Sequence, residues 1–188
     1  MRFSDLVRGA SLRGAPDVFS FSASLRLGRA IGVLLRRRGL SASTTLVGRS
    51  GGPAEARVRD GIVAGFLASG LSVADLGVVL SDQFTAALRR GPARGVRGAS
   101  SWPVGTGVLI SATGESVGVM LFEGTRPLVG EHLGVVARLA DEGLCVSVDG
   151  GQVILVDARQ LSTAAVDNGA DGADGADDDA SGEQAVAS

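Results

Sequence analysis

The sequence predicts a three-layer α/β/α sandwich, in which helices cover both faces of a central sheet. Short apolar runs bounded by glycine and small polar residues alternate with longer segments whose apolar residues recur at helical spacing. The clearest example is residues 107–122, which read as two buried strands joined by a tight polar turn. The 188 residues, with 45% hydrophobic content, suffice for one domain with its own core.

Charge is distributed unevenly and marks a boundary within the chain. Residues 167–188 hold seven of the 20 acidic residues and no basic residue, so 13 acidic residues remain elsewhere against 18 arginines, a balance of +5. This last stretch is also low in complexity, with repeated Gly, Ala and Asp. We therefore expect a folded domain over residues 1–165 and a disordered acidic tail over 166–188 that aids solubility.

The elements expected in the first half alternate between helix and strand. Residues 1–20 are extended and contain two Arg-Gly pairs. The elements that follow are a helix over 21–38 stopped by Gly39, a strand over 43–48, a helix over 54–69 stopped by Gly70, a strand over 72–76, and a helix capped by Ser81 or Asp82.

The second half is expected to contain a loop over 91–106, the two strands within 107–122, a helix over 130–142, and a β-hairpin of 145–148 with 153–156. The turn between the two buried strands carries Ser111, Thr113, Glu115 and Ser116. Segments that leave a buried strand of an α/β fold commonly carry the chemistry, so this turn is the first place to look for a site.

Five short motifs, in order along residues 2–160, resemble those of one enzyme family. They are Phe3-Ser4-Asp5-Leu6-Val7-Arg8-Gly9; Val47-Gly48-Arg49-Ser50-Gly51-Gly52; Gly65-Phe66-Leu67-Ala68-Ser69-Gly70 with Val73-Ala74-Asp75-Leu76-Gly77; the segment from Gly107 to Phe122; and Gly124-Thr125-Arg126-Pro127-Leu128. They resemble patterns of the α-D-phosphohexomutases, which include phosphoglucomutase and phosphomannomutase. In the same order, the family patterns are F-G-T-[SD]-G-[IV]-R-G, V-G-R-D-x-R, G-L-x-x-x-G with V-x-D-L-G, G-V-M-I-T-A-S-H-N-P with N-G-I-K-L-F, and G-x-P-L. The resemblance is to the first domain of these enzymes, and it implies a sandwich with a mixed, mostly parallel sheet.

The resemblance also implies where phosphate chemistry would lie. In the family, the serine of T-A-S-H-N-P carries a phosphate, gives it to a sugar phosphate and regains one from the bisphosphate intermediate. Such transfer needs Mg²⁺ and cationic groups around the moving phosphate. The serine corresponds to Thr113, the candidate catalytic residue, and the candidate phosphate-binding residues are Arg8, Arg49 and Ser111.

The same segments depart from the family where the reaction takes place. The His, Asn and Pro after the family's serine correspond to Gly114, Glu115 and Ser116, and the loop is about three residues shorter. Glu115 places negative charge beside the expected phosphate, which is unfavourable. Ser50 replaces the Asp of V-G-R-D-x-R, and the D-G-D-x-D-R metal loop of the family's second domain has no counterpart. We therefore expect no metal site or cofactor in this chain alone, with Mg²⁺ involved only where a partner supplies the metal loop.

Two functions from different classes follow. The first is a truncated, degenerate relative, a pseudoenzyme that acts by associating with a second copy or with a full-length phosphohexomutase, or by binding a sugar phosphate. The second is a subunit that contributes the four candidate residues to an intramolecular phosphotransferase acting on hexose phosphates, while a partner supplies the missing domains.

Each candidate residue also has an ordinary structural interpretation. Thr113 suits a simple turn position, and Ser111 suits a hydroxyl that hydrogen bonds to backbone at the end of a strand. The two candidate arginines suit pairing with nearby acids such as Asp5 or Asp17.

The sequence disfavours several other functions. No apolar run approaches the roughly 18 residues that span a bilayer, and the amino terminus lacks a signal pattern, so we expect a cytoplasmic protein without a membrane partner. Arg36-Arg37-Arg38 fits a solvated helix end better than a nucleic-acid surface, because no aromatic residues are interleaved. Cys145 has no second cysteine, and His132 has no second ligand at metal spacing.

Overall fold

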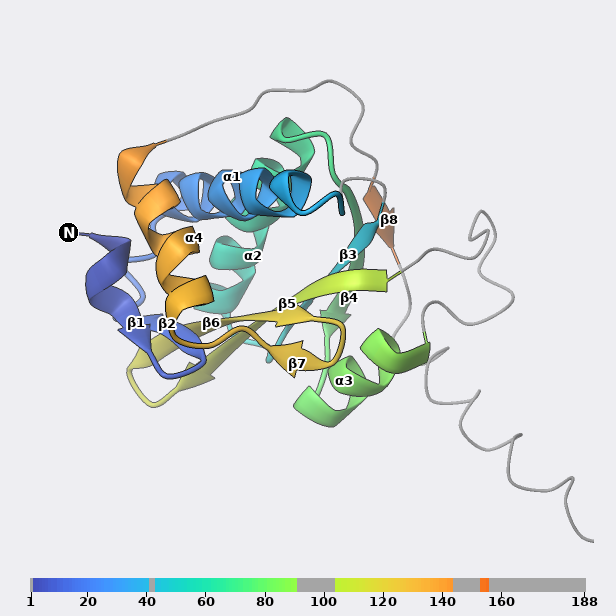
Figure 1. Cartoon of the computed structure of the whole chain (residues 1–188). Helices are drawn as coiled ribbons and strands as arrows, with labels where there is room; N and C mark the ends of the chain where they lie inside the picture. The colour runs from blue at the N-terminus through green and yellow to red at the C-terminus, as the bar shows by residue number, and fades with distance from the viewer. Residues whose placement is uncertain (1, 41–42, 91–103, 144–152, 156–188) are drawn as a thin grey trace, which may run out of the picture.

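The computed structural model of the chain describes residues 2–40, 43–90, 104–143 and 153–155 (Figure 1). In chain order the elements are η1 (Phe3–Leu6), β1 (Val7–Arg8), β2 (Ser11–Gly14), α1 (Phe21–Arg37), β3 (Thr44–Arg49), α2 (Pro53–Ala68), β4 (Ser72–Val78), α3 (Ser81–Arg90), β5 (Val104–Thr113), β6 (Ser116–Glu123), β7 (Arg126–Pro127), α4 (Glu131–Glu142) and β8 (Val153–Leu155). Helices and strands alternate from α1 to β5, as the hydrophobic pattern predicts.

The described strands form one mixed sheet. Its order is β1-β2-β6-β5-β3-β4-β8, and β7 pairs with β6 outside this path. The strands β5, β3, β4 and β8 are parallel, whereas β1, β2 and β6 join the sheet through antiparallel pairs. The carboxyl ends of β3, β4 and β5 therefore meet at one edge, which is the edge where α/β folds commonly bind ligands.

Helices cover both faces of the sheet, which confirms the three predicted layers (Figure 1). The helices α1, α2 and α4 pack on one face and α3 packs on the other. Successive residues of β5 divide between these two cores, because side chains alternate along a strand. Val108 and Ile110 belong to the core under α1 and α2, and Leu109 belongs to the core under α3.

Glycine allows α1 and α2 to pack closely. A Cβ atom on Gly65 of α2 would lie 2.7 Å from the backbone nitrogen of Arg29 in α1, and one on Gly28 of α1 would lie 3.0 Å from the Cα of Ile62 in α2. Both distances are shorter than a carbon atom tolerates. The separation of these two helices therefore depends on the absence of side chains at Gly28 and Gly65.

The described helices lie near their predicted bounds. The helix α1 ends one residue before the predicted end, and Gly39 follows it in a left-handed conformation with φ of +72°. The helix α2 begins with Pro53 in its first turn, where proline costs no hydrogen bond. None of the helices in the described ranges is both long enough and apolar enough to cross a membrane.

The strands differ more from their predicted bounds. β5 begins at Val104, within the segment expected to be a loop, and the paired part of the β5–β6 hairpin is longer than predicted. β8 forms where the second strand of a hairpin is expected, and it pairs in parallel with β4. The expected partner strand, residues 145–148, and the acidic tail lie outside the described residues.

Candidate functional site

The polar residues between the two central strands lie at the tip of the β5–β6 hairpin. β5 and β6 pair in antiparallel register until a last pair joins Thr113 to Ser116. Only Gly114 and Glu115 remain in the turn, and Gly114 has a φ of +59°, which glycine adopts without strain. The polar turn is therefore shorter than expected, and Ser111 and Thr113 are held in a strand.

Thr113, the candidate catalytic residue, is exposed at the end of β5. Its carbonyl oxygen accepts a hydrogen bond from the Ser116 hydroxyl over 3.0 Å. No side chain within the described ranges hydrogen bonds to the Thr113 hydroxyl. The hydroxyl therefore faces solvent, and Glu115, the acidic residue closest in the chain, is exposed as well.

Ser111 faces the α3 side of the sheet, in the same row as Leu109. It pairs with Gly118 of β6, and Gly118 pairs in turn with Arg13 of β2. A Cβ atom on Gly118 would lie 3.6 Å from Ser111 Oγ and 3.7 Å from Arg13 Cγ. Ser111 and Arg13 therefore stand on the same face of the sheet, on opposite sides of a glycine.

Arg8 brings a second guanidinium group to this face. It pairs with Ser11 across β1 and β2, and residues directly opposite in an antiparallel pair point to the same side. Arg13 Nε donates a hydrogen bond to Ser11 Oγ over 3.2 Å, so Ser11 and Arg13 share this side as well. We call this surface the polar sheet face, and its members are Arg8, Ser11, Arg13, Ser111, Thr113, Ser116 and Gly118.

Arg49 lies on the other face of the sheet. It pairs with Ile110 in the parallel β3–β5 register, and Ile110 belongs to the core under α1 and α2. The Nε atom of Arg49 is buried and has no hydrogen-bond partner in the described part of the chain. Neither Asp5 nor Asp17 forms an ion pair with Arg8 or Arg49 there.

Ser50 and Glu55 join the end of β3 to β5 and to the first turn of α2. The Ser50 hydroxyl donates to Glu55 Oε1 over 3.0 Å and accepts the backbone N–H of Ala112 over 3.1 Å. Burial raises the pKa of the Glu55 carboxyl, but hydrogen bonds from the backbone of Glu55 and Gly52 and from Ser50, together with the charge of Arg49, outweigh burial and lower the pKa. The one proton of the Ser50 hydroxyl is therefore donated to Glu55, and the hydroxyl links β5 to the first turn of α2.

The structure places three of the four candidate residues on one face of the sheet, with β2 and β6 between Arg8 on β1 and the two candidates on β5. Arg8, Ser111 and Thr113 share the polar sheet face, and Arg49 does not. The sequence reasoning missed Arg13 and Ser11, which lie between Arg8 and Ser111. The only sequence signal for Arg13 is its Arg-Gly pair, because its neighbour across the sheet, Gly118, is more than 100 residues away in the chain.

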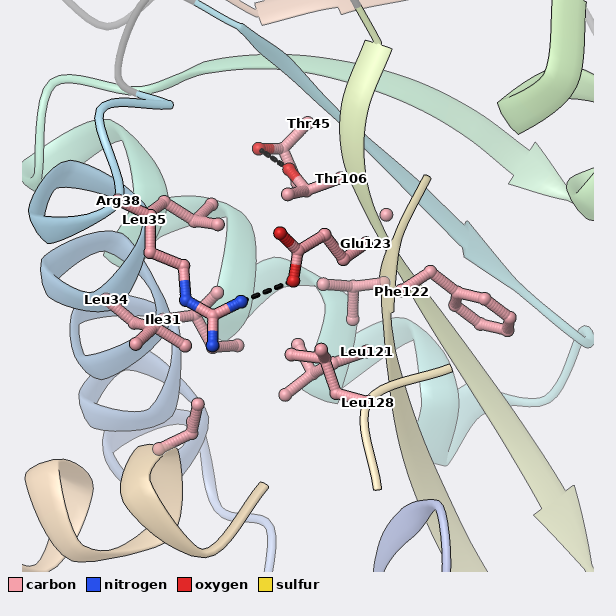
Figure 2. Close-up of a pocket in the computed structure, with 13 residues that line it drawn as sticks. Ile31, Leu34, Leu35, Arg38, Thr45, Thr106, Leu121, Phe122, Glu123 and Leu128 are labelled. Atoms are coloured by element: carbon pink, nitrogen blue, oxygen red, sulfur yellow. Dashed lines mark hydrogen bonds and ion pairs between the residues drawn. The ribbon is translucent and has the colours of Figure 1, made fainter. Parts of the chain in front are cut away.

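A second candidate site is the cavity between the end of α1, α4 and the sheet (Figure 2). Its walls are mostly apolar, with Leu34 and Leu35 on one side and Leu121 and Leu128 on the other. At its rim the guanidinium group of Arg38, the residue that follows α1, forms an ion pair with the Glu123 carboxylate (Figure 2). This ion pair partly closes the entrance.

The cavity contains one polar pair, in which the hydroxyls of Thr45 and Thr106 lie 2.9 Å apart (Figure 2). Thr45 and Thr106 are near the beginnings of β3 and β5, whereas Thr113 ends β5. The cavity is therefore at the opposite end of the sheet from the polar sheet face. Within the described ranges, no three His, Cys, Asp or Glu side chains lie together in a way that could hold a metal ion.

Comparisons with known proteins give matches only at the level of structure. No family model matches the sequence, and no curated protein matches it. Among solved structures, a phosphoglucomutase/phosphomannomutase family protein from Burkholderia thailandensis matches with a TM-score of 0.68 and 18% identity, over 86% of this chain and 35% of that protein. A provisionally assigned phosphomannomutase from Thermus thermophilus matches with a TM-score of 0.64 and 22% identity, over 87% of this chain and 36% of that protein.

These matches confirm the predicted fold at identities too low to transfer a function. The chain spans about a third of the length of the solved proteins that it matches. The chain therefore has the α/β fold that part of the phosphoglucomutase and phosphomannomutase proteins has.

Proposed function

We propose that this protein acts in the cytoplasm by binding the phosphate group of a hexose phosphate on the polar sheet face, without transferring that phosphate. The observation that carries the proposal is the placement of Arg8, Ser111 and Thr113 on one face at the carboxyl end of the parallel strands. Arginine and hydroxyl groups are good partners for phosphate oxygens, and this end of an α/β sheet is where ligands commonly bind. The fold shared with phosphoglucomutase/phosphomannomutase proteins makes a hexose phosphate the first ligand to test.

The setting of Thr113 argues against transfer by this chain alone. Phosphoryl transfer depends on a positioned acceptor and on cations that neutralise the moving phosphate. The Thr113 hydroxyl has no hydrogen-bonded base or cation among the described residues, and the adjacent turn carries the charge of Glu115. The short hairpin also holds Thr113 in a paired strand, which restricts how the hydroxyl can approach a substrate.

Association with a second protein is part of the proposal, and the candidates are a second copy of the chain and a full-length phosphohexomutase. Two apolar side chains support it, because Val78, the last residue of β4, and Leu80, two residues later, are 54% and 71% exposed. Val78 Cγ1 lies 3.6 Å from the position of a Cβ atom on Gly51, so this apolar pair borders the loop after β3. Exposed apolar groups beside a ligand-binding edge suit a protein contact.

Isothermal titration calorimetry of the full chain with glucose 1-phosphate tests the binding claim. We expect saturable binding that weakens about tenfold in Arg8→Gln, because a charged hydrogen bond to phosphate is lost. Arg126→Gln is the matched control, since Arg126 is exposed on β7, outside the polar sheet face, and we expect it to bind as the wild type does. Equal heats for glucose 1-phosphate and free glucose would contradict a phosphate-directed site.

The alternative is that the chain carries a phosphate on Thr113 within a complex, and the exposure of that hydroxyl favours it. In this case a full-length phosphohexomutase supplies the Mg²⁺ loop. Mass spectrometry of the chain after incubation with Mg²⁺, glucose 1,6-bisphosphate and such a mutase tests this function. Phosphate on Thr113 that is absent from Thr113→Ala supports a phosphoryl carrier, and unmodified Thr113 supports binding alone.

A further inference from the structure

An open depression lies beside the first turn of α1 and contains no residue of the polar sheet face. Its volume is about 560 Å³, and it is lined by Pro16, Asp17, Phe19, Ser20, Phe21 and Arg57. We propose that this depression is a self-association surface, on which a second copy of the chain binds across a two-fold axis. The inference rests on the association part of the proposed function, where a second copy is one candidate, and it requires no ligand on the polar sheet face.

Local structure holds the walls of the depression in place. Residues 15–18 form a β-turn, closed by a hydrogen bond of 3.1 Å from its last N–H to its first carbonyl oxygen. Pro16 occupies the second position of this turn, where its fixed φ suits the turn. The Ser20 hydroxyl then caps α1 by accepting the N–H of Ala23 over 3.3 Å. A surface that is already formed loses little conformational entropy when a partner binds.

Phe21 gives this surface an exposed aromatic ring. It is the first residue of α1 and is 54% exposed, whereas Phe19, which also lines the depression, is 1% exposed. The contact of α1 with α2 fixes the start of α1, because a Cβ atom on Gly61 would lie 2.8 Å from the Phe21 carbonyl oxygen. In a two-fold dimer the ring of each copy enters the depression of the other copy, beside Pro16. Dimerisation therefore buries two rings that are half exposed in the single chain.

The two charged residues of the depression are complementary. Asp17 and Arg57 carry opposite charges, and both are exposed. Neither forms an ion pair with another side chain in the described part of the chain. Asp17 Oδ1 accepts the N–H of Val18 over 3.0 Å, which leaves Oδ2 for a partner. Across a two-fold axis, Asp17 of each copy faces Arg57 of the other, so the dimer forms two equivalent ion pairs.

The surface is complementary to itself, which favours a second copy over an unrelated partner. A two-fold interface brings the same patch of both copies together, so it needs a protruding group beside a hollow, and charges of both signs. Phe21 and the depression meet the first requirement, and Asp17 and Arg57 meet the second. A purely anionic or purely cationic partner would leave one of the two charges unmatched.

Sedimentation velocity of the full chain over a wide range of concentrations tests the dimer. We expect a monomer–dimer equilibrium in the wild type. Asp17→Arg and Arg57→Asp, each measured alone, should weaken dimerisation about tenfold, because each places two pairs of like charges across the interface. Phe21→Ser should weaken dimerisation as well, because it removes the ring that enters the other copy.

An equimolar mixture of the two charge variants gives the sharpest test. In the mixed dimer, the arginine introduced by Asp17→Arg faces the aspartate introduced by Arg57→Asp, and the second contact keeps its native pair. We therefore expect the mixture to dimerise as the wild type does, although neither variant does so alone. Failure of the mixture to recover the dimer would overturn the paired contacts across a two-fold axis.

Two variants on another surface serve as controls. Arg138→Asp reverses the charge of an exposed arginine on α4, and Val129→Ser removes an apolar side chain of similar exposure, 53%, from the segment before α4. Both should dimerise as the wild type does. The inference would be rejected by a wild-type chain that stays monomeric at every concentration, or by a dimer that Phe21→Ser and both charge variants leave unchanged.

Calorimetry with glucose 1-phosphate separates this inference from the proposed ligand binding. Loss of the dimer in Arg57→Asp with unchanged affinity for glucose 1-phosphate supports the inference and shows that the two surfaces act independently. A monomeric wild type that binds glucose 1-phosphate rejects the dimer and keeps the ligand-binding function. A wild-type dimer that is lost in Arg57→Asp but does not bind glucose 1-phosphate supports the inference and rejects the ligand-binding function.

Discussion

Ser50 and Glu55, at the carboxyl end of β3, have a structural role, because their hydrogen bonds hold β5 and α2 together. Ser50 stands where the resembled family has an aspartate, and its hydroxyl bonds both to Glu55 and to the backbone N–H of Ala112. Glu55 is 4% exposed and also accepts the N–H of Gly52 over 3.2 Å. A buried carboxylate with several donors stays charged, so this group ties α2 to the sheet at neutral pH.

Asp141, near the end of α4, forms a comparable contact with η1. It accepts the backbone N–H of Phe3 over 2.5 Å and the N–H and hydroxyl of Ser4, and so fastens η1 to the end of α4. Burial raises the pKa of Asp141, but these hydrogen bonds and the charge of Arg26 outweigh burial and lower the pKa below its ordinary value of 3.8. The folded state therefore binds this proton less readily than the unfolded state does.

A pH-dependent loss of stability follows from these two carboxylates. A lowered pKa in the folded state stabilises the protein above the unfolded pKa, and this contribution disappears as the pH falls through the lowered value. We expect the free energy of unfolding, measured with urea, to be steady from pH 7 to about pH 5. It should then decrease once the pH is lower than the ordinary pKa of a carboxyl group. Asp141→Asn should be less stable than the wild type at pH 7, and its free energy of unfolding should decrease less on acidification. An identical acid profile for the two proteins would contradict the role of Asp141.

Single residues were also where sequence reasoning was weakest. The resemblance pointed to Arg8, Arg49, Ser111 and Thr113, but the face to which a side chain points depends on strand register. Arg49 lies on the α2 side because it pairs with Ile110, and no local pattern around it indicates this. Its buried Nε atom and its closeness to Glu55 became visible only in three dimensions.

At the scale of elements, the packing of α1 on α2 depends on glycine. Helical periodicity predicts both helices and their ends, because apolar spacing and stop signals are local. The close contact between them is not predictable from one helix alone, since it requires Gly28 of α1 and Gly65 of α2 to meet the backbone of the partner helix.

Alanine substitutions test this contact. Gly65→Ala should destabilise the protein by about 2 kcal/mol, because its methyl group would force α1 and α2 apart by more than the gain in helix propensity offsets. Gly134→Ala, in open space on α4, should instead stabilise by about 0.5–1 kcal/mol. Urea unfolding of both variants measures the difference. Equal effects of the two substitutions would show that the α1–α2 contact tolerates a side chain.

In the β5–β6 hairpin, the sequence predicts the strands but not the length of the turn between them. Its two apolar runs are correctly predicted as strands, but the polar residues Ser111, Thr113 and Ser116 suggest a longer turn. The pairing continues through them, because β6 also pairs with β2, and this outer strand supports the polar end of the hairpin. Composition alone does not reveal that support.

At the scale of the molecule, topology creates the proposed binding face. β2 joins the sheet beside β6, so residues 11–14 lie next to residues 117–120, and only β6 separates them from β5. The layered fold was predictable from alternating helix and strand patterns, and solved proteins confirm it with TM-scores of 0.68 and 0.64. The juxtaposition of Arg13 and Ser111 was not, because it depends on an antiparallel pair between distant segments.

The central claim, binding of a hexose phosphate without transfer, is tested most directly by ³¹P NMR of glucose 1-phosphate with the full chain, Mg²⁺ and glucose 1,6-bisphosphate. We predict that the glucose 1-phosphate signal shifts or broadens as protein is added, and that no glucose 6-phosphate signal appears. An unchanged glucose 1-phosphate signal would contradict binding, and growth of a glucose 6-phosphate signal would contradict the absence of transfer.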